Sequence, residues 1–464
     1  MGTPNEQPNK KWKITIAAVI AGIAVTVLWI FGRSFLNIAL NPRNRIYQYN
    51  YAVRCSSGTQ AQKAQAADWL KKSAGQGYAP AENMLGAYYQ EGDGGITKDA
   101  SLAFQFFARA AASGYAPAFG NVGFCYEYGS GTQRDTGKAA EFYEKGVQKN
   151  DKYCEYRLGL CCHSGTGVPK DTAKAAELVA KAAGQGLPEA ANTLGVWYYQ
   201  GDGVSKDPTK AADYFARGTK SSNPKSEYNL GICYLDGNGV EKDPTKAIGL
   251  FTKSAAQGFA DAENKLGLCY ERGDGVAKDE TKAVEWFRKG AQSGNADSEG
   301  YLGYCYTNGI GVKSDDRQAF SWYQRAAAQG DATGELNMGI CFQNGRGVAQ
   351  DKAQAFQWFS KSAAQKDPVA TDMVGECYLY GTGVVQDEGK AVEWFRKSAA
   401  LNNERAFEML GWCYLKGKGV PVDYNQAGAS LQKAVDLGSE EAKQFLAMLI
   451  RQNDGTYAAA PGIK

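Results

Sequence analysis

The sequence predicts an all-α solenoid built from repeated helix–turn–helix units. The first observation behind this prediction is a glycine preceded by an apolar residue, which recurs at eight intervals of 36 residues and one of 37. The second is an aspartate with the same period, and the third is a glycine-rich turn between the two. A fixed period of this length is typical of a solenoid, in which each unit contacts only its neighbours. The periodic glycines are Gly86, Gly123, Gly159, Gly195, Gly231, Gly267, Gly303, Gly339, Gly375 and Gly411.

Each unit is expected to contain two helices. The first holds small and apolar residues at helical spacing, as in Ala262, Leu266 and Tyr270, and the glycine-rich turn ends it. The aspartate then caps the second helix, and Pro208 and Pro244 follow it at the first helical position in two units. The predicted capping aspartates are Asp135, Asp171, Asp207, Asp243, Asp279, Asp315, Asp351, Asp387 and Asp423. The second helix is expected to bury Ala283, Trp286, Phe287 and Ala291 in one unit, and Ala391, Trp394, Phe395 and Ala399 in another.

An uncharged run of about 18 residues, Ile14 to Phe31, precedes the repeats. Residues 14–32 are therefore predicted to be a transmembrane anchor, between a tail over 1–13 and a juxtamembrane linker over 33–46. A cleaved signal peptide and a buried helix are the alternatives. Basic residues flank both ends almost equally, and a short tail favours a bacterial inner-membrane protein with a periplasmic repeat domain. A cytoplasmic repeat domain stays open as the alternative.

Composition argues against several functional classes. The net charge is +3, from 52 basic and 49 acidic side chains, which is too small to attract nucleic acid at long range. His163 is the one histidine, so a histidine-based metal cluster is disfavoured. The sequence predicts no catalytic residue, no cofactor and no metal site.

Eight of the eleven cysteines share one repeat position. Equivalent positions in stacked units are about a helix-packing distance apart, 8–10 Å, whereas a disulfide needs Cα atoms within about 4.4–6.8 Å. These thiols are therefore expected to be unpaired, small buried side chains. They are Cys125, Cys161, Cys233, Cys269, Cys305, Cys341, Cys377 and Cys413.

The repeated pattern LGxCYxxGxGVxxDxxKAxxWF resembles the Sel-one-like repeat family, a relative of the tetratricopeptide repeats. The resemblance covers ten units over 79–439 and implies a right-handed superhelix that acts as an adaptor for protein partners. Residues 47–78 match only the second half of a unit and 440–453 lack the glycine, so both are expected to be terminal caps, the latter a single helix. Residues 454–464 are expected to be a flexible tail. A cysteine-rich branch of the family joins its helices by cysteines eight residues apart, and here Cys154 faces Gly146 instead of a second cysteine.

The resemblance also implies a binding groove on the first helices, which we expect to be rich in aromatic residues and poor in charge. Such a groove suits a peptide or a helix of a protein partner. The predicted function is a membrane-anchored, non-enzymatic scaffold. The alternatives are a cell-envelope enzyme or a carbohydrate- or antibiotic-binding protein on the same fold, and a secreted scaffold after signal cleavage. The implied groove residues are Tyr128, Tyr156, His163, Tyr199, Tyr228, Asp236, Tyr304, Asn308, Asn344, Glu376, Tyr380, Trp412 and Lys416.

Overall fold

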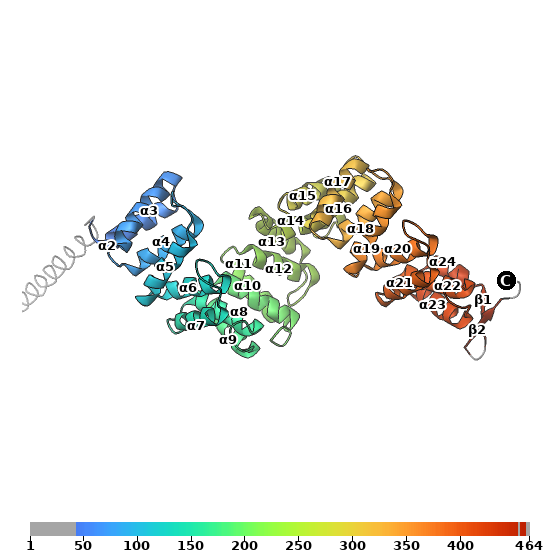
Figure 1. The fold of residues 1–464 in the computed structure, drawn as a ribbon, viewed down its shortest axis with the longest axis horizontal. Coiled ribbons are helices and arrows are strands. Elements are labelled where there is room, and N and C mark those ends of the chain that lie inside the picture. Colours follow the sequence, from blue (N-terminus) through green and yellow to red (C-terminus); the bar gives the residue numbers. More distant parts are fainter. Residues whose placement is uncertain (1–42, 453–454, 461–464) are drawn as a thin grey trace, which may run out of the picture. The chain divides into compact units, whose positions relative to one another are not determined.

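The structure is a computed structural model that describes residues 43–452 and 455–460. These residues contain 23 helices, α2 to α24, and one two-stranded sheet (Figure 1). Each even-numbered helix up to α22 packs on the odd-numbered helix that follows it, and we call these the first and second helices of a repeat. The first helices are α2 (Arg45–Ser56), α4 (Ala79–Glu91), α6 (Ala116–Tyr128), α8 (Lys152–Ser164), α10 (Pro188–Gln200), α12 (Pro224–Asp236), α14 (Ala260–Arg272), α16 (Ala296–Asn308), α18 (Ala332–Asn344), α20 (Pro368–Tyr380) and α22 (Glu404–Lys416). The second helices are α3 (Gln60–Ala74), α5 (Ala100–Ala112), α7 (Thr136–Val147), α9 (Thr172–Gly184), α11 (Pro208–Thr219), α13 (Pro244–Ala256), α15 (Glu280–Gln292), α17 (Asp316–Ala328), α19 (Lys352–Ala364), α21 (Glu388–Ala400) and α23 (Tyr424–Leu437).

The chain forms two compact units, one ending at Ser221 and the other beginning at Ser222. The first unit contains α2 to α11, and the second contains α12 to α24 with the sheet. Within each unit, every helix packs on its neighbours in the chain, so the core is a series of small clusters along the stack of helices.

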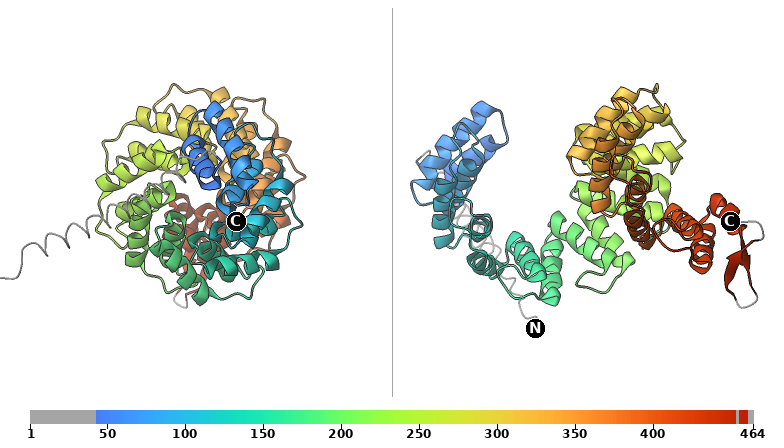
Figure 2. Two further views of the ribbon diagram at one scale, coloured as in Figure 1. Left: turned by 90° about the vertical axis from the view of Figure 1, so that its left-hand side faces the viewer. Right: turned by 45° about the vertical axis from the view of Figure 1, so that its right-hand side comes forward.

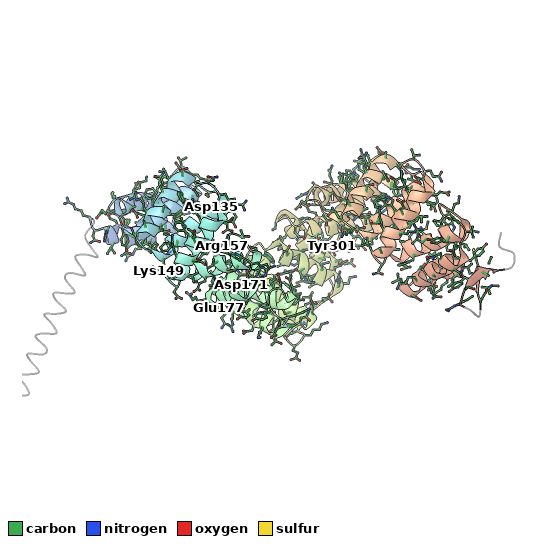
Figure 3. All side chains as sticks on the ribbon, turned by 60° about the horizontal axis from the view of Figure 1, so that its bottom comes forward. Asp135, Lys149, Arg157, Asp171, Glu177 and Tyr301 are labelled. Carbon is green, nitrogen blue, oxygen red and sulfur yellow. The ribbon has the colours of Figure 1, made fainter. Side chains whose placement is uncertain are left out.

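The predicted helix starts are confirmed. Asp135 and Asp171, labelled in Figure 3, precede α7 and α9, and each carboxylate accepts the backbone N–H three residues further on. The other seven predicted aspartates cap their second helices in the same way. Asp99 caps α5 likewise and was absent from the predicted set. Each such cap satisfies a backbone donor that the helix leaves without a partner.

The periodic glycine is explained by a close approach between the two helices of a repeat. A Cβ atom added at Gly303 would lie 2.4 Å from the ring of Tyr323 on α17. The corresponding distance from Gly267 to the ring of Phe287 is also 2.4 Å. Real Cβ atoms do not approach other atoms this closely, so only glycine lets the aromatic ring of the second helix lie flat on the first helix.

The second helices bury one aromatic ring of each Trp-Phe pair. Phe287 and Phe395 are fully buried, as predicted. Trp286 and Trp394 are half-buried, so the prediction that the second helix buries them is wrong. Neighbouring side chains on a helix point about 100° apart, so only one ring of the pair can face the first helix. The Trp286 ring packs instead against the core cluster that α13 and α14 form, and the ammonium group of Lys289 lies 4.0 Å from its centre.

The N-terminal end holds a complete helix pair, which brings the described residues to eleven repeats instead of the ten predicted. Helix α2 packs on α3, and Ala52 and Leu70 are fully buried between them and their neighbours. The connection from Ser56 to Gln60 is shorter than the loops of the other repeats, and α2 contains no glycine. Because of these two departures, the first pair does not match the 36-residue pattern from which the repeats were predicted.

The C-terminal end differs from the single helix expected over 440–453. Helix α24 (Glu440–Leu446) is short, and β1 (Leu449–Arg451) pairs antiparallel with β2 (Tyr457–Ala459), so the described chain also contains a sheet that was not expected (Figure 2). Tyr457 covers Gly428 of α23, where an added Cβ would lie 2.4 Å from the ring. The hairpin thus packs on the last helix pair, where a further repeat would otherwise cover the apolar surface.

The eight periodic cysteines lie in the core, as predicted. Burial raises the pKa of Cys233 to about 11 and that of Cys305 to about 12. A thiol reacts as its thiolate, so these buried thiols are inert at neutral pH. Gly146 does face Cys154, because a Cβ at Gly146 would lie too close to the Cys154 sulfur to be accommodated.

The predicted localisation as a single-pass membrane protein needs correction. No helix in the ranges 43–452 and 455–460 combines the length and the apolar character needed to cross a bilayer. The predicted anchor, residues 14–32, lies outside the described residues.

Candidate binding surface

All of the predicted groove residues lie on first helices. Seven are exposed and six are half-buried. First helices of adjacent repeats also pack on each other, as α6 does on α8 and α16 does on α18. Residues at the same register on successive first helices are therefore neighbours on one face within each unit. The exposed residues are Tyr128, Asp236, Tyr304, Asn308, Asn344, Tyr380 and Lys416, and the half-buried residues are Tyr156, His163, Tyr199, Tyr228, Glu376 and Trp412.

Two half-buried tyrosines make packing contacts. The ring of Tyr228 lies 5.5 Å from the ring of Phe259 and 5.7 Å from that of Phe251, measured between centroids. The hydroxyl of Tyr156 is 3.1 Å from that of Thr193 on the next first helix. Because these rings are engaged within the solenoid, they offer less area to a partner than the exposed tyrosines do.

His163 and Glu376 also have partners within the chain. The imidazole of His163 stacks on Trp197, with ring centroids 4.3 Å apart and planes 11° apart. Glu376 accepts hydrogen bonds from the guanidinium of Arg405 at 3.1 and 2.9 Å. Both side chains therefore contribute to contacts between successive first helices.

Four aromatic side chains of the described residues are exposed, and all four are tyrosines on first helices. Their exposed fractions are 57% for Tyr128, 36% for Tyr153, 46% for Tyr304 and 62% for Tyr380. Tyr153 was missing from the predicted set. Tyrosine combines a large apolar ring with a polar hydroxyl and few rotatable bonds, which suits a surface that is covered by a protein partner.

In the first unit, a network of polar side chains holds Tyr128. Arg157, labelled in Figure 3, donates a hydrogen bond of 3.0 Å to the Tyr128 hydroxyl and forms an ion pair with Glu127. The Tyr143 hydroxyl donates to the same Glu127 carboxylate at 2.7 Å. Burial and the Glu127 carboxylate raise the pKa of Tyr143, so its hydroxyl stays protonated and remains a donor.

The surface beside this network is filled. Gly120 on α6 has no side chain, and the ring of Tyr153 on α8 occupies the space above it, 2.8 Å from where a Cβ would be. The face between α6 and α8 is therefore closed by aromatic side chains.

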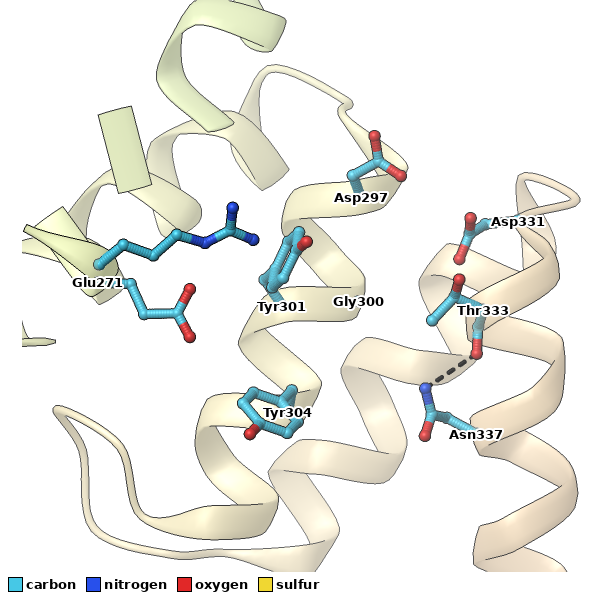
Figure 4. A pocket seen from close by; sticks show the side chains of 9 residues that line it. Glu271, Asp297, Gly300, Tyr301, Tyr304, Asp331, Thr333 and Asn337 are labelled. Atoms are coloured by element: carbon cyan, nitrogen blue, oxygen red, sulfur yellow. Dashed lines mark hydrogen bonds between the residues drawn. The ribbon is translucent and has the colours of Figure 1, made fainter. Parts of the chain in front are cut away.

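The second unit has a cleft of about 330 Å³ between its own first helices, which we call the acidic cleft. Figure 4 shows it between α14, α16 and α18, with Tyr301 and Tyr304 on one side and Thr333 and Asn337 on the other. Its lining residues are Glu271, Arg272, Asp297, Gly300, Tyr301, Tyr304, Asp331, Thr333 and Asn337. Three carboxylates and one guanidinium give this lining a net charge of two negative units.

Only Tyr304 of the lining was in the predicted set, and the expectation of a charge-poor groove is wrong for this part of the surface. The register carried over from tetratricopeptide repeats omitted the positions six and two residues before the periodic glycine, which hold Asp297 and Tyr301. It did include the position four residues after the glycine, where His163 stands in another repeat, but Glu271 at this position was not in the predicted set. The sequence contained a signal for one of them, because Asp261 and Asp297 both stand six residues before a periodic glycine.

Burial, together with the neighbouring carboxylates of Asp331 and Asp261, raises the pKa of Asp297. Neighbouring carboxylates disfavour the ionisation of the Asp297 carboxyl, and no nearby cation fully offsets their negative charge. The carboxylates of Asp297 and Asp331 in the acidic cleft are thus close enough to repel each other. No group of three or more His, Cys, Asp or Glu among the described residues has a geometry that could hold a metal ion.

Comparison with known proteins identifies the repeat. The Sel1 repeat model matches most of the chain, in eleven segments. They cover residues 46–78, 79–115, 121–151, 152–187, 188–223, 224–259, 260–295, 296–331, 332–367, 368–403 and 408–439. The chain belongs to the Sel1 repeat family. The family resemblance predicted from the sequence is confirmed, and Sel1 repeat proteins are generally scaffolds for protein interactions.

Solved structures of Sel1 repeat proteins are similar to this chain. A protective antigen present in uropathogenic Escherichia coli strains, which displays an SLR fold, is 33% identical, with a TM-score of 0.61 over 82% of this chain and 81% of the antigen. A Sel1 repeat protein from Oxalobacter formigenes is 31% identical, with a TM-score of 0.50 over 66% of this chain and 89% of that protein. No curated protein matches this chain at a significant level.

Proposed function

We propose that this Sel1 repeat protein is a non-enzymatic scaffold that binds a protein or peptide partner on the face formed by its first helices. The observation that supports the proposal is the position of the exposed tyrosines. Tyr128, Tyr153, Tyr304 and Tyr380 leave apolar ring area in water, and each of them lies on a first helix.

The side chains expected to bind a partner differ from those that stabilise the fold. Phe287 and Phe395 are fully buried and account for packing. Tyr128 and Tyr380 are more than half exposed, so more than half of each side chain is not used for packing inside the solenoid. Binding residues are those that the fold leaves available, and interfaces concentrate their binding energy in a few aromatic side chains of this kind.

Site-specific photo-crosslinking tests the proposal. A photoreactive phenylalanine analogue replaces Tyr128 or Tyr380 in the full chain, and matched control positions are Glu177 and Glu393, which are exposed on second helices. We expect covalent adducts with a protein partner from the first-helix positions and none from the controls. Adducts that form equally from both sets would contradict the proposal.

Alanine variants measure the energetic contribution of the same rings. Tyr128→Ala and Tyr380→Ala should each weaken capture of the crosslinked partner by about 1 kcal/mol or more at a true hot spot, which is roughly fivefold. The melting temperature of Tyr380→Ala should change little, because this ring is largely exposed, whereas Tyr128→Ala also removes the hydrogen bond from Arg157 and should lower it slightly. Unchanged capture in both variants would show that the partner binds elsewhere.

A further inference from the structure

The acidic cleft is open because the residue that would fill it is short. Gly300 on α16 contributes no side chain, and the nearest atom to a Cβ added there is a carboxylate oxygen of Asp331 at 4.0 Å. Thr333 on α18 stands at the repeat position that Tyr153 occupies in the first unit. A threonine side chain cannot reach across as the tyrosine ring does, which leaves a space of about 330 Å³.

The walls of this space combine aromatic rings with negative charge. Tyr301 and Tyr304 project from α16, and Glu271, Asp297 and Asp331 surround them from α14, α16 and the start of α18 (Figure 4). None of these three carboxylates forms an ion pair with another side chain of the described residues. Arg272 is the single cation of the lining, so it leaves two negative charges uncompensated.

One carboxylate oxygen of Asp331 accepts the Gly334 N–H at 2.6 Å and caps α18. Its other oxygen has no hydrogen bond or ion pair within the described residues, and the side chain projects toward the cleft in Figure 4. The negative charge of the cleft is therefore held in place by the fold, because a helix cap positions this carboxylate.

We propose that the acidic cleft binds the side chain of a lysine or arginine in an extended segment of a protein partner. The aliphatic part of such a side chain packs on Tyr301 and Tyr304, and its cationic end reaches the carboxylates of Asp297 and Asp331. A phosphate-bearing ligand such as a nucleic acid is repelled by the same carboxylates. The inference rests on the proposed function and names the partner chemistry for one part of the binding face.

A displayed library of random 12-residue peptides tests the inference on the full chain. Peptides are selected on the wild-type protein and then compared on the double variant Asp297→Asn, Asp331→Asn, which removes two charges but keeps side-chain size and a capping oxygen. The matched control, Glu285→Gln with Glu393→Gln, removes two exposed carboxylates from second helices. Circular dichroism checks that all proteins keep their helical content.

Three results are expected if the inference holds. Selected peptides are enriched in lysine or arginine, they bind the cleft variant at least tenfold more weakly than wild type, and they bind the control variant as tightly as wild type. A third variant, Gly300→Leu, fills the cleft without changing charge and should weaken the same peptides at least tenfold. Its effect separates insertion into the cleft from general attraction to an acidic surface.

Other results overturn the inference and distinguish it from the proposed function. Equal losses in the cleft and control variants indicate attraction by overall charge, and failure to select any peptide that prefers wild type shows that the cleft does not take a cationic segment. Selected peptides without basic residues that still lose binding in Tyr304→Ala would overturn the cationic ligand while leaving the first-helix face as a binding surface.

Discussion

Gly120 on α6 and Gly300 on α16 occupy the same repeat position, three residues before a periodic glycine, and five 36-residue periods separate them. The space above Gly120 is filled by the ring of Tyr153 from the next first helix, whereas the space above Gly300 is open. In the second region, around Gly300, Thr333 stands at the repeat position that Tyr153 holds in the first region, around Gly120. The helical frame therefore positions the surface, while one side chain from the following repeat determines whether the surface is closed or hollow.

The two regions also share a buried tyrosine and differ in what it contacts. Tyr143 and Tyr323 hold the same position on their second helices, where the other repeats of the solenoid mostly have phenylalanine. The Tyr143 hydroxyl donates to the charged Glu127, whereas the Tyr323 hydroxyl is 3.1 Å from the Thr307 hydroxyl. The first region thus contains an internal ion pair, and the second contains only neutral contacts at this point.

The largest expected difference comes from removing the cation of the first region. Arg157→Ala leaves the Glu127 carboxylate, whose exposed fraction is 17%, without its ion-pair partner. It should lower the free energy of unfolding by about 3–5 kcal/mol. Asn337→Ala, at the equivalent position on α18, should change it by less than about 0.5 kcal/mol, because that side chain only bonds the Thr333 carbonyl of its own helix. Urea unfolding followed by circular dichroism compares the two variants, and equal costs would show that the ion pair does not stabilise the first region.

A smaller difference is expected from the two tyrosine hydroxyls. Tyr143→Phe removes a hydrogen bond to a carboxylate and should cost about 1.5–3 kcal/mol, whereas Tyr323→Phe removes one between two hydroxyls and should cost about 0.5–1.5 kcal/mol. Both variants keep the ring that covers the periodic glycine, so packing is unchanged. Thermal melting by calorimetry measures the difference. A larger cost for Tyr323→Phe would reverse the assignment of charged and neutral regions.

The two glycines should respond to the same substitution with opposite signs. Gly300→Ala adds a methyl group into open space in a helix and should stabilise the protein by about 0.5–1 kcal/mol through helix propensity. Gly120→Ala places a Cβ 2.8 Å from the Tyr153 ring and should destabilise it by about 1 kcal/mol. Urea unfolding of both variants provides the measurement. The comparison fails if both substitutions shift stability in the same direction.

The smallest effect concerns pH and the crowded carboxylates of the acidic cleft. The pKa of Asp297 is raised in the folded chain, so the folded state binds its proton more tightly than the unfolded state. Stability from this group is present below the ordinary pKa of aspartate and is lost as the pH rises through the raised value. Asp297→Asn should therefore stabilise the protein by a few tenths of a kcal/mol at pH 7 and by nothing at pH 3, since solvent screens a carboxylate that is only partly buried.

Melting temperatures at pH 3 and pH 7 check this dependence. The control is Glu285→Gln on α15, an exposed residue outside the cleft, which should give the same small change at both values. A gain for Asp297→Asn that is larger at pH 3 than at pH 7 would contradict the sign.

Much of the fold could be predicted because its signals are local. A capping aspartate such as Asp279 acts on a backbone N–H three residues away, and the small residues of a helix face recur every three or four positions. Repetition of these signals then identified the Sel1 repeat. The groove residues were predicted less well, because the register carried over from a related repeat placed Tyr304 at the surface but contained no position for Asp297 or Tyr301.

The sequence by itself determined the helical repeat, the caps of the second helices and the buried position of Phe287, since each depends on a few neighbouring residues and on a period. Tertiary structure decided which of two adjacent rings is buried, how the C-terminal end is covered by a hairpin, and where the surface is hollow. The acidic cleft exists because Thr333 fails to fill a space above Gly300, and that relation lies between two helices of successive repeats. A local sequence pattern carries no information about the distance between side chains on two different helices. Only the packing of the helices determines whether this space is filled.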